Sequence, residues 1–145
     1  MSERVGIVAS SFDLFHAGHV LMLQEAKEHC DRLVVALQSD PTLDRPEKNK
    51  PIQGLFERYA QVEACKYVDQ VIPYDTEEDL YNLLAGYEWD VRFLGADYVG
   101  RRIDSITGYD LDIPIHYCTR NHSYSSSSLR ERIKAADRIE FTLAS

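Results

Sequence analysis

The sequence has few cysteines, no long apolar run and fewer basic than acidic residues, and each shortage excludes a class of protein. Its 145 residues include three cysteines, which form no CxxC pair. This argues against a disulfide framework or a zinc ribbon and predicts free thiols in a reducing compartment. No segment approaches the ~20 apolar residues that span a bilayer, and the first residues lack the pattern of a secretory signal. We therefore expect a cytoplasmic protein with no membrane partner.

The balance of charge is acidic. Sixteen Lys and Arg residues against 24 Asp and Glu residues give a formal net charge of -8. A surface that binds nucleic acid must be basic enough to neutralise phosphates, so we expect no nucleic-acid partner. A site for a small anion must then be concentrated in a few residues. The length and the 44% hydrophobic content fit one globular domain, to which we assign residues 1–145.

Short apolar runs alternate with segments of helical periodicity. We predict strands at 4–9, 33–37, 68–73, 91–95 and 113–118, and helices at 18–30, 55–65, about 80–84 and 129–136. This alternation predicts an α/β fold, a single Rossmann-like, doubly wound domain with a five-stranded parallel sheet and helices on both faces. Two irregular segments, 40–53 and 96–112, interrupt the pattern. The first follows the second strand and is placed to close over a ligand at the carboxyl edge of the sheet.

The run SSFDLFHAGH, from Ser10 to His19, carries the strongest chemical signal. It joins the first strand to the first helix, whose N-terminus offers free N–H groups and a partial positive charge to a phosphate. His16 and His19 can point at the same anion, and Gly18 leaves room for a nucleotide near the backbone. Core packing explains either histidine alone but not the pair. A metal site is the weaker alternative, because no third ligand lies at a usual zinc spacing.

FDLFHAGH resembles the F-D-x-x-H-x-G-H signature of the HxGH nucleotidyltransferase superfamily, in particular the small cytidylyltransferases typified by glycerol-3-phosphate cytidylyltransferase. The resemblance extends from Val5 to about Ala136. It implies that the two histidines are catalytic and contact the transferring phosphoryl group. For Asp13 it leaves three roles open: orienting a histidine, touching a metal through water, or fixing the loop. The nucleotide-binding residues that it implies in this motif are Ser11, Phe12, Asp13 and Gly18.

A second motif, TRNHSYSSSSLR at 119–130, is similar to the family's R-T-x-G-I-S-T-T segment. Four serines before an apolar-periodic segment offer an N-cap and several hydroxyl donors, more than a plain capped helix needs. The resemblance implies a catalytic Arg120 that offsets phosphate charge. Ser123 replaces the family's glycine, and His122 receives no role. The hydroxyls expected to grip the triphosphate are those of Ser125, Ser126 and Ser127.

Two weaker segments complete the predicted site. Lys48 and Lys50 lie in a polar loop and would alone be read as solvated surface, but the family carries a lysine pair upstream of an E-x-R-like helix, here Glu57-Arg58. The resemblance implies that the pair reaches the acceptor and nucleotide phosphates, with Lys48 catalytic. LGADY resembles the family's G-x-D-[WY] segment and implies that Gly95 and Asp97 bind the base or ribose. A simple turn after a strand explains LGADY equally well.

The resemblance implies that an acceptor phosphate attacks the α-phosphorus of a nucleoside triphosphate and releases pyrophosphate. Because the nucleophile is already an anion, positioning and charge stabilisation suffice. We expect Mg2+ on the substrate phosphates, with no metal site built by the protein. CTP and a small phosphorylated alcohol such as glycerol 3-phosphate are favoured, although 75–90 lacks the basic residue that glycerol-phosphate enzymes tend to offer the acceptor. A homodimer is also implied.

Three alternatives stay open. An adenylyltransferase of the same superfamily, using ATP with a sugar phosphate or flavin nucleotide, would share the H-x-G-H motif and the hydroxyl-rich helix start. A non-catalytic nucleotide-binding module would fit Ser10, which stands where the family usually has glycine. A purely structural interaction protein would leave the phosphate-directed residues unexplained.

Overall fold

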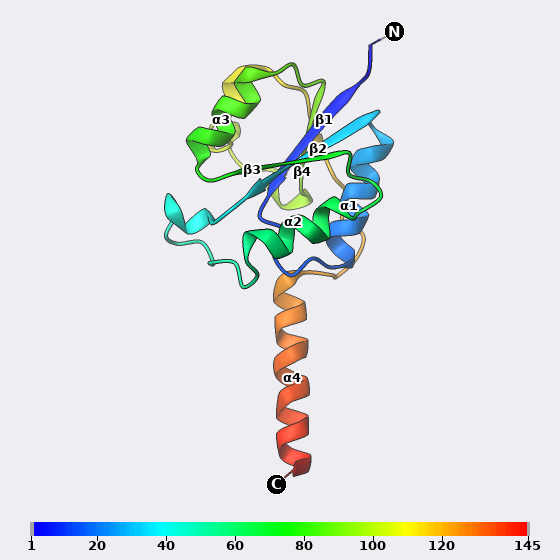
Figure 1. Cartoon of the computed structure of the whole chain (residues 1–145), viewed down its shortest axis with the longest axis vertical. Helices are drawn as coiled ribbons and strands as arrows, with labels where there is room; N and C mark the ends of the chain where they lie inside the picture. The colour runs from blue at the N-terminus through cyan, green and yellow to red at the C-terminus, as the bar shows by residue number, and fades with distance from the viewer. Residues whose placement is uncertain (1, 145) are drawn as a thin grey trace.

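Strands and helices alternate along the chain in the order that the apolar pattern predicts (Figure 1). The computed structural model describes residues 2–144, with side-chain surroundings as far as Arg138. No helix within 2–144 combines the length and the apolar character needed to cross a membrane. The strands are β1 (Val5–Ser10), β2 (Arg32–Gln38), β3 (Gln70–Tyr74), β4 (Val91–Leu94) and β5 (Ile115–Tyr117). The helices are α1 (Ala17–Glu28), α2 (Leu55–Glu63), α3 (Glu77–Gly86) and α4 (Ser126–Ala144).

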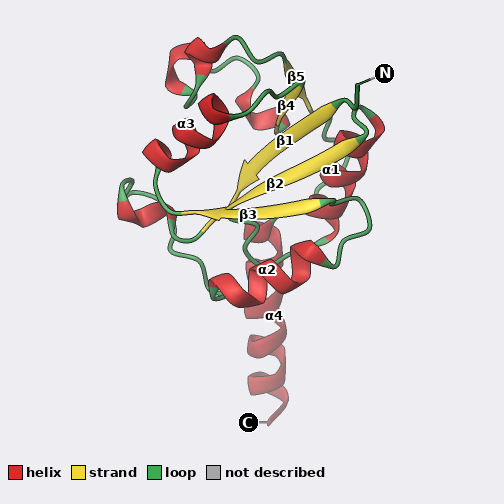
Figure 2. Ribbon diagram, turned by 45° about the horizontal axis from the view of Figure 1, so that its top comes forward, coloured by secondary structure: helices red, strands yellow, loops and turns green. Residues whose placement is uncertain are grey.

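All five strands pair in parallel, in the order β3-β2-β1-β4-β5. Helices α1 and α2 cover one face of the sheet and α3 the other (Figure 2). The predicted doubly wound α/β fold with a five-stranded parallel sheet is therefore confirmed. The order of the strands reverses between β1 and β4. In open sheets of this kind, ligands bind outside the carboxyl ends of the strands at such a reversal.

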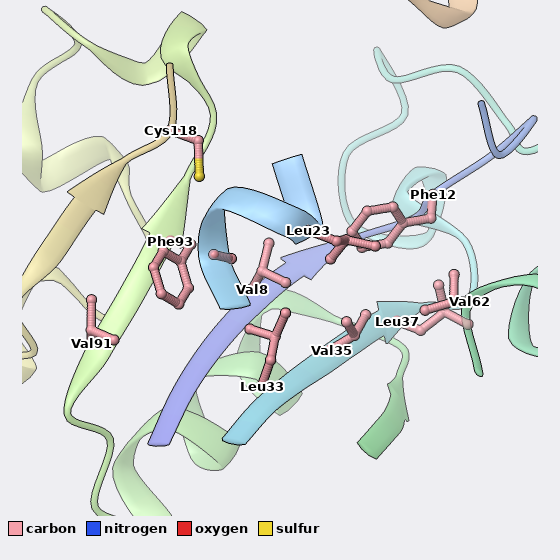
Figure 3. Packing of buried hydrophobic residues seen from close by; sticks show 11 residues of the cluster. Val8, Phe12, Leu23, Leu33, Val35, Leu37, Val62, Val91, Phe93 and Cys118 are labelled. Carbon is pink, nitrogen blue, oxygen red and sulfur yellow. The ribbon is translucent and has the colours of Figure 1, made fainter. Parts of the chain in front are cut away.

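Alternate side chains of the central strands enter two separate apolar layers, as expected for strands that are buried on both faces. One layer lies under α1 and α2 (Figure 3), and its members include Val8, Leu33, Val35, Leu37 and Phe93 from the sheet and Leu23 and Val62 from the helices. The other lies under α3 and is smaller, with Ile7, Ala36, Tyr74, Leu80 and Leu84. The sheet is thus held rigidly from both sides up to its carboxyl edge.

The predicted boundaries are wrong chiefly at the last helix. The apolar period predicts a helix at 129–136, but α4 begins at Ser126 and continues to Ala144. The Ser125 hydroxyl accepts a hydrogen bond from the Ser128 N–H at 3.0 Å and so caps the helix. Hydroxyl side chains, which carry no apolar signal, form the first turn. Three short 3-10 turns, Ala96–Tyr98, Ile103–Ser105 and Tyr109–Leu111, lie in the segment predicted as irregular, and a fourth, Pro41–Leu43, follows β2.

A buried arginine ties the loops of the carboxyl edge together. Arg58 of α2 is only 1% exposed, and its guanidinium donates to four backbone carbonyls. The distances run from 2.5 to 3.0 Å, and the acceptors are Ser11 after β1, Gln38 and Ser39 at the end of β2, and Gln53 before α2. Asp13 adds a second link, because its carboxylate accepts from the N–H groups of Ile52 and Gln53 at 2.9 and 3.0 Å.

Replacing Arg58 with methionine should destabilise the protein. Four buried or half-buried carbonyls would lose a charged donor, and we expect the free energy of unfolding to fall by about 2–4 kcal/mol. Urea unfolding followed by circular dichroism measures this change. The matched control is Arg132→Met at an exposed position of α4, which should stay within about 0.5 kcal/mol of wild type. Equal stability of the two variants would contradict the role given to Arg58.

Candidate active site

Three cavities lie along the carboxyl edge of the sheet. The histidine cavity, about 360 Å³, lies between the start of α1, the turn after β4 and the segment before α4; its lining includes His16, His19, Gly95, Asp97, Arg120, His122, Tyr124, Ser125 and Ser126. The loop cavity, about 290 Å³, is lined by Ser10, Ser11, Phe12, Asp13, His19, Pro41, Lys48, Asn49, Pro51, Ser126 and Arg130. The arginine cavity, about 230 Å³, faces α3, and Ser10, Ser11, Lys48, Arg45, Arg92 and Arg101 help to line it.

The two motif histidines begin α1, and each is held through its Nδ1 atom. His16 is the N-cap residue and accepts from the Gly18 N–H at 3.0 Å, while His19 accepts from the His16 N–H at 3.2 Å. Their rings stack with centroids 3.9 Å apart. Because Nδ1 is an acceptor in both rings, this hydrogen-bond pattern assigns the proton of each neutral ring to Nε2. Two Nε2–H donors therefore remain for a ligand.

Burial keeps both imidazoles uncharged near neutral pH. Burial and then the neighbouring His16 lower the pKa of His19 to about 3. The pKa of His16 is lowered by burial and, to a smaller extent, by His122 and Arg120. The first turn of α1 contains no acidic side chain, so no carboxylate competes there with an anion for the N–H groups that the two histidines leave free. The start of α1 thus offers directed N–H donors that carry no full charge. The positive charge that balances a bound anion must come from neighbouring lysine and arginine side chains.

Gly18 makes room for imidazole rings. A Cβ atom at this position would lie 2.8 Å from Cε1 of His16 and 3.1 Å from Cε1 of His122. Any larger residue would push one of these rings away. The expected role of Gly18, admitting a nucleotide close to the backbone, therefore gains a second reason that the motif alone does not reveal. The glycine thus permits the rings of His16 and His122 to approach the same helix start.

The second motif supplies one wall of the histidine cavity. Arg120 lines that cavity and donates from Nη2 to the Tyr124 carbonyl at 3.1 Å. His122 stacks on Tyr124 with ring centroids 5.1 Å apart, and its Nδ1 accepts from the Tyr124 N–H at 3.1 Å. The sequence gives His122 no role and does not single out Tyr124. Both residues line the histidine cavity. The only feature of the sequence that could have indicated this is the aromatic residue two positions after a histidine.

The three serines of this motif separate in the structure. Ser126 lines both the histidine cavity and the loop cavity, and its hydroxyl donates to the Asp13 carbonyl at 3.4 Å. Ser125 lines the histidine cavity while capping α4. Ser127 is exposed and lines none of the three cavities. The lysine pair separates in the same way, because Lys48 lines the loop and arginine cavities and Lys50 lines none of the three.

Residues 11–13 build the floor between the cavities. Ser11 lines the loop and arginine cavities. Phe12 is 1% exposed, and its ring meets His19 edge-on with centroids 5.2 Å apart, so it supports the histidine. Asp13 holds the loop before α2 as described and also pairs with Arg130 at 3.3 Å. Of the three roles open to Asp13, the structure shows loop fixing. Arg130, which also lines the loop cavity, was not predicted as a site residue.

Gly95 and Asp97 both line the histidine cavity, at the end of β4. A Cβ at Gly95 would lie 2.8 Å from Oδ1 of Asp97, so the glycine allows this carboxylate to fold back over the turn. Asp97 also lies 3.6 Å from Nη2 of Arg101. The segment is a turn after a strand, and it places a carboxylate in the lining of the cavity that Arg120 also lines.

The arginine cavity is the part of the site that sequence reasoning missed. Four cations line it, Arg45, Lys48, Arg92 and Arg101, with the single carboxylate of Glu77. Arg45 and Glu77 form an ion pair at 2.5 Å. In the sequence, Arg45 is one basic residue of a polar loop and Arg92 interrupts an apolar strand. The charged residue within the apolar strand was the one feature of the sequence that could have indicated this cavity, because a charge in a buried strand requires a partner or a ligand.

A different cluster, Glu25, His116 and Cys118, has the geometry of a metal site, with ligand atoms within 4.8 Å of one another. Glu25 is already engaged, since it accepts from His116 Nε2 at 2.8 Å and from the Thr119 hydroxyl at 2.6 Å. Burial raises the pKa of the Cys118 thiol to about 12, which disfavours the thiolate that binds metals. The cluster instead fastens β5 to α1 and so fixes the residue before Arg120.

The structure is thus an α/β domain with a parallel sheet, in which the sequence H-A-G-H begins the first helix at the edge where strand order reverses. The chain belongs to the cytidylyltransferase-like family, whose model matches residues 7–132. The predicted family is therefore confirmed.

Individual relatives agree with this assignment. The chain is 39% identical over 113 residues to the bifunctional protein HldE of Gluconacetobacter diazotrophicus and 34% identical over 114 residues to the ethanolamine-phosphate cytidylyltransferase of Arabidopsis thaliana. These matches cover 74% and 78% of this chain but 22% of each relative, so the chain spans about a fifth of their length. A lipopolysaccharide core biosynthesis protein from Thermoplasma volcanium shares the fold, with a TM-score of 0.71 at 23% identity, over 83% of this chain and all of that one.

The lowered pKa of His19 predicts how stability depends on pH. Below pH 6.5 the unfolded chain protonates His19 whereas the folded protein does so only near pH 3. As the pH is lowered from 6.5 towards 3, the free energy of unfolding should therefore decrease. This residue contributes up to about 1.4 kcal/mol per pH unit to that decrease. His19→Asn, which retains an acceptor for the His16 N–H, should flatten the dependence. Urea unfolding at several pH values measures this dependence for wild type and for His19→Asn. The same dependence in both proteins would contradict the lowered pKa given to His19.

Proposed function

We propose that this domain transfers the nucleotidyl group of a nucleoside triphosphate, preferably CTP, to the phosphate of a small phosphorylated alcohol such as glycerol 3-phosphate, and releases pyrophosphate. One observation carries the proposal. The neutral rings of His16 and His19 present Nε2–H donors at a helix start, beside the cationic Arg120. Such a cluster suits a phosphoryl group that gains negative charge as it is transferred.

The connection between cavities supports an in-line reaction. His19 and Ser126 line both the histidine cavity and the loop cavity, so a triphosphate can extend from one to the other. Ser10, Ser11, Pro41 and Lys48 line both the loop cavity and the arginine cavity. An acceptor phosphate that enters from the arginine cavity would meet the triphosphate at this shared wall. Lys48 would offset the charge of two phosphates there, as a point charge on a flexible stem.

The remaining catalytic contributions come from position and charge. The acceptor oxygen is already anionic, so no general base is needed, and the uncharged histidines would hold the α-phosphate oxygens through Nε2–H. Arg120 would bind the nucleotide on the histidine-cavity side. Mg2+ bound to the phosphates would supply further positive charge to the leaving pyrophosphate. The donor set fits a weakly protein-bound ion, because both Asp13 oxygens are already hydrogen-bonded.

The preference for CTP is supported by the description of the family and by the relative named as a cytidylyltransferase. The competing function is adenylyl transfer with ATP. Pyrophosphate release measured with each of the four ribonucleoside triphosphates and glycerol 3-phosphate separates them. The proposal expects the highest kcat/KM with CTP, and a highest value with ATP would replace it by adenylyl transfer. Tight nucleotide binding without any turnover would identify a non-catalytic module.

Substituting either motif histidine should disable catalysis without unfolding the protein. His16→Ala and His19→Ala each remove a donor to the transferring phosphoryl group, and we expect turnover to fall by at least about two orders of magnitude. His29→Ala, at an exposed histidine outside the three cavities, should retain wild-type turnover. A coupled pyrophosphate assay measures the rates, and circular dichroism verifies the fold. Near-normal release by either motif variant would overturn the mechanism.

Divalent metal should be required although the protein provides few ligands. Excess EDTA is expected to reduce pyrophosphate release to background, and added Mg2+ to restore it, because the uncompensated phosphate charge opposes attack by an anion. The unfolding midpoint without nucleotide should be the same with and without EDTA. Full turnover in EDTA would contradict the expected role of the metal, and a shifted midpoint would indicate a metal site in the protein itself.

A further inference from the structure

We propose that Arg92 recognises the alcohol portion of the acceptor, and that this portion carries hydroxyl or acidic groups and no amine. This inference rests on the proposed function, because it assigns the acceptor to the arginine cavity. It makes Arg92 a specificity-determining residue and names the chemical class of the substrate.

Arg92 is a cation placed inside the sheet. It lies in β4 in register with Ile7 of β1, on the face that α3 covers, and is 5% exposed. Its Nη1 donates to the Thr107 carbonyl. Among the residues whose side chains are described, no carboxylate forms an ion pair with it. Glu77 attracts Arg92 only from beyond ion-pair distance. Burying a charge without a direct counter-ion is costly, and a guanidinium that lines a cavity can recover that cost from an anionic or hydroxylated ligand.

The position of Arg92 within the cavity assigns it to the alcohol end of an acceptor. The phosphate end lies at the wall shared with the loop cavity, where Ser11 and Lys48 are found. Arg92 and Thr107 line the arginine cavity but not the loop cavity. Gly108 has a φ of +83° and lets the backbone pass close to Leu84 and Arg92. A Cβ at this position would lie 2.7 Å from the Leu84 side chain and 3.5 Å from Nη1 of Arg92. The cavity volume of about 230 Å³ limits the acceptor to a small molecule.

The charges of the cavity disfavour an amine. Both oxygens of its one carboxylate, that of Glu77, already have a partner: Oε1 pairs with Arg45 at 2.5 Å and Oε2 accepts from the Thr107 hydroxyl at 2.9 Å. An ammonium group would therefore meet Arg92 and Arg101 without a free counter-ion. Hydroxyl or carboxylate oxygens would instead accept hydrogen bonds from the guanidinium. The relative from Arabidopsis thaliana is named for an amine-bearing acceptor, and this cavity predicts a different choice within the same family.

The buried cation of this cavity comes from the sheet and not from α3. The segment 75–90, which contains α3, has no lysine or arginine. Arg92 of β4 is therefore the cation that faces α3 from within the sheet.

The test compares Arg92→Met and Arg92→Lys with wild type in the full chain, using CTP with glycerol 3-phosphate or ethanolamine phosphate. For wild type we expect kcat/KM to be at least about tenfold higher with glycerol 3-phosphate, the discrimination expected from charge-assisted hydrogen bonds. Arg92→Met should raise the KM for glycerol 3-phosphate by about tenfold or more, with kcat and the KM for CTP nearly unchanged, and Arg92→Lys should recover part of the loss. Arg132→Met on exposed α4 is the matched control.

Arg92→Met leaves the Thr107 carbonyl without its donor, so circular dichroism first verifies that the variant is folded, and the lysine variant retains the charge if it is not. Equal use of the two acceptors by wild type, or an unchanged KM in a folded Arg92→Met, would overturn this inference and leave nucleotidyl transfer intact. If neither acceptor is turned over, calorimetric titration of glycerol 3-phosphate and ethanolamine phosphate tests the cavity assignment independently of catalysis. Tighter binding of glycerol 3-phosphate that is lost in Arg92→Met would still support the cavity assignment while the proposed reaction fails.

Discussion

The site depends on one buried guanidinium, that of Arg58. The functional side chains lie on loops, and loops hold their shape only when their backbone groups are satisfied. Arg58 joins the ends of β1 and β2 to the segment before α2 through four carbonyls. Because these bonds go to the backbone and not to carboxylates, Arg58 organises the carboxyl edge without neutralising acidic side chains there. It fixes the wall on which Ser11 and Lys48 lie.

Directed hydrogen-bond donors and positive charge are supplied by different residues of the site. The histidines at the start of α1 are uncharged and directional, whereas the cations lie on other elements. Arg120 before α4 lines the histidine cavity, Lys48 after β2 lines the loop and arginine cavities, and Arg92 in β4 lines the arginine cavity. A chain with a net charge of -8 can in this way create a local positive field. The loop cavity lies between the other two, because it shares His19 and Ser126 with the histidine cavity and Ser11 and Lys48 with the arginine cavity.

Local patterns predicted the fold and the phosphate-directed residues, because both depend on short stretches of sequence. Apolar runs such as 33–37 specify buried strands, and HAGH specifies a helix start with two imidazoles. Residues that act through distant partners could not be found in this way. The motif pattern picks out Glu57-Arg58 but not the four carbonyls that Arg58 binds. Arg92 acquires its cavity only when α3 and the segment around Thr107 close over β4. Lys50 and Ser127 show the converse, since motif position alone did not bring them to a cavity.

The most direct test of the central claim follows the α-phosphate. The full chain is incubated with α-32P-labelled CTP, Mg2+ and glycerol 3-phosphate, and the products are separated by chromatography. The account predicts that the label moves into a CDP-linked product in equal amount to the pyrophosphate released, with none bound to the protein, because the acceptor attacks directly. Label that stays in CTP, or that becomes covalently attached to the protein, would contradict it.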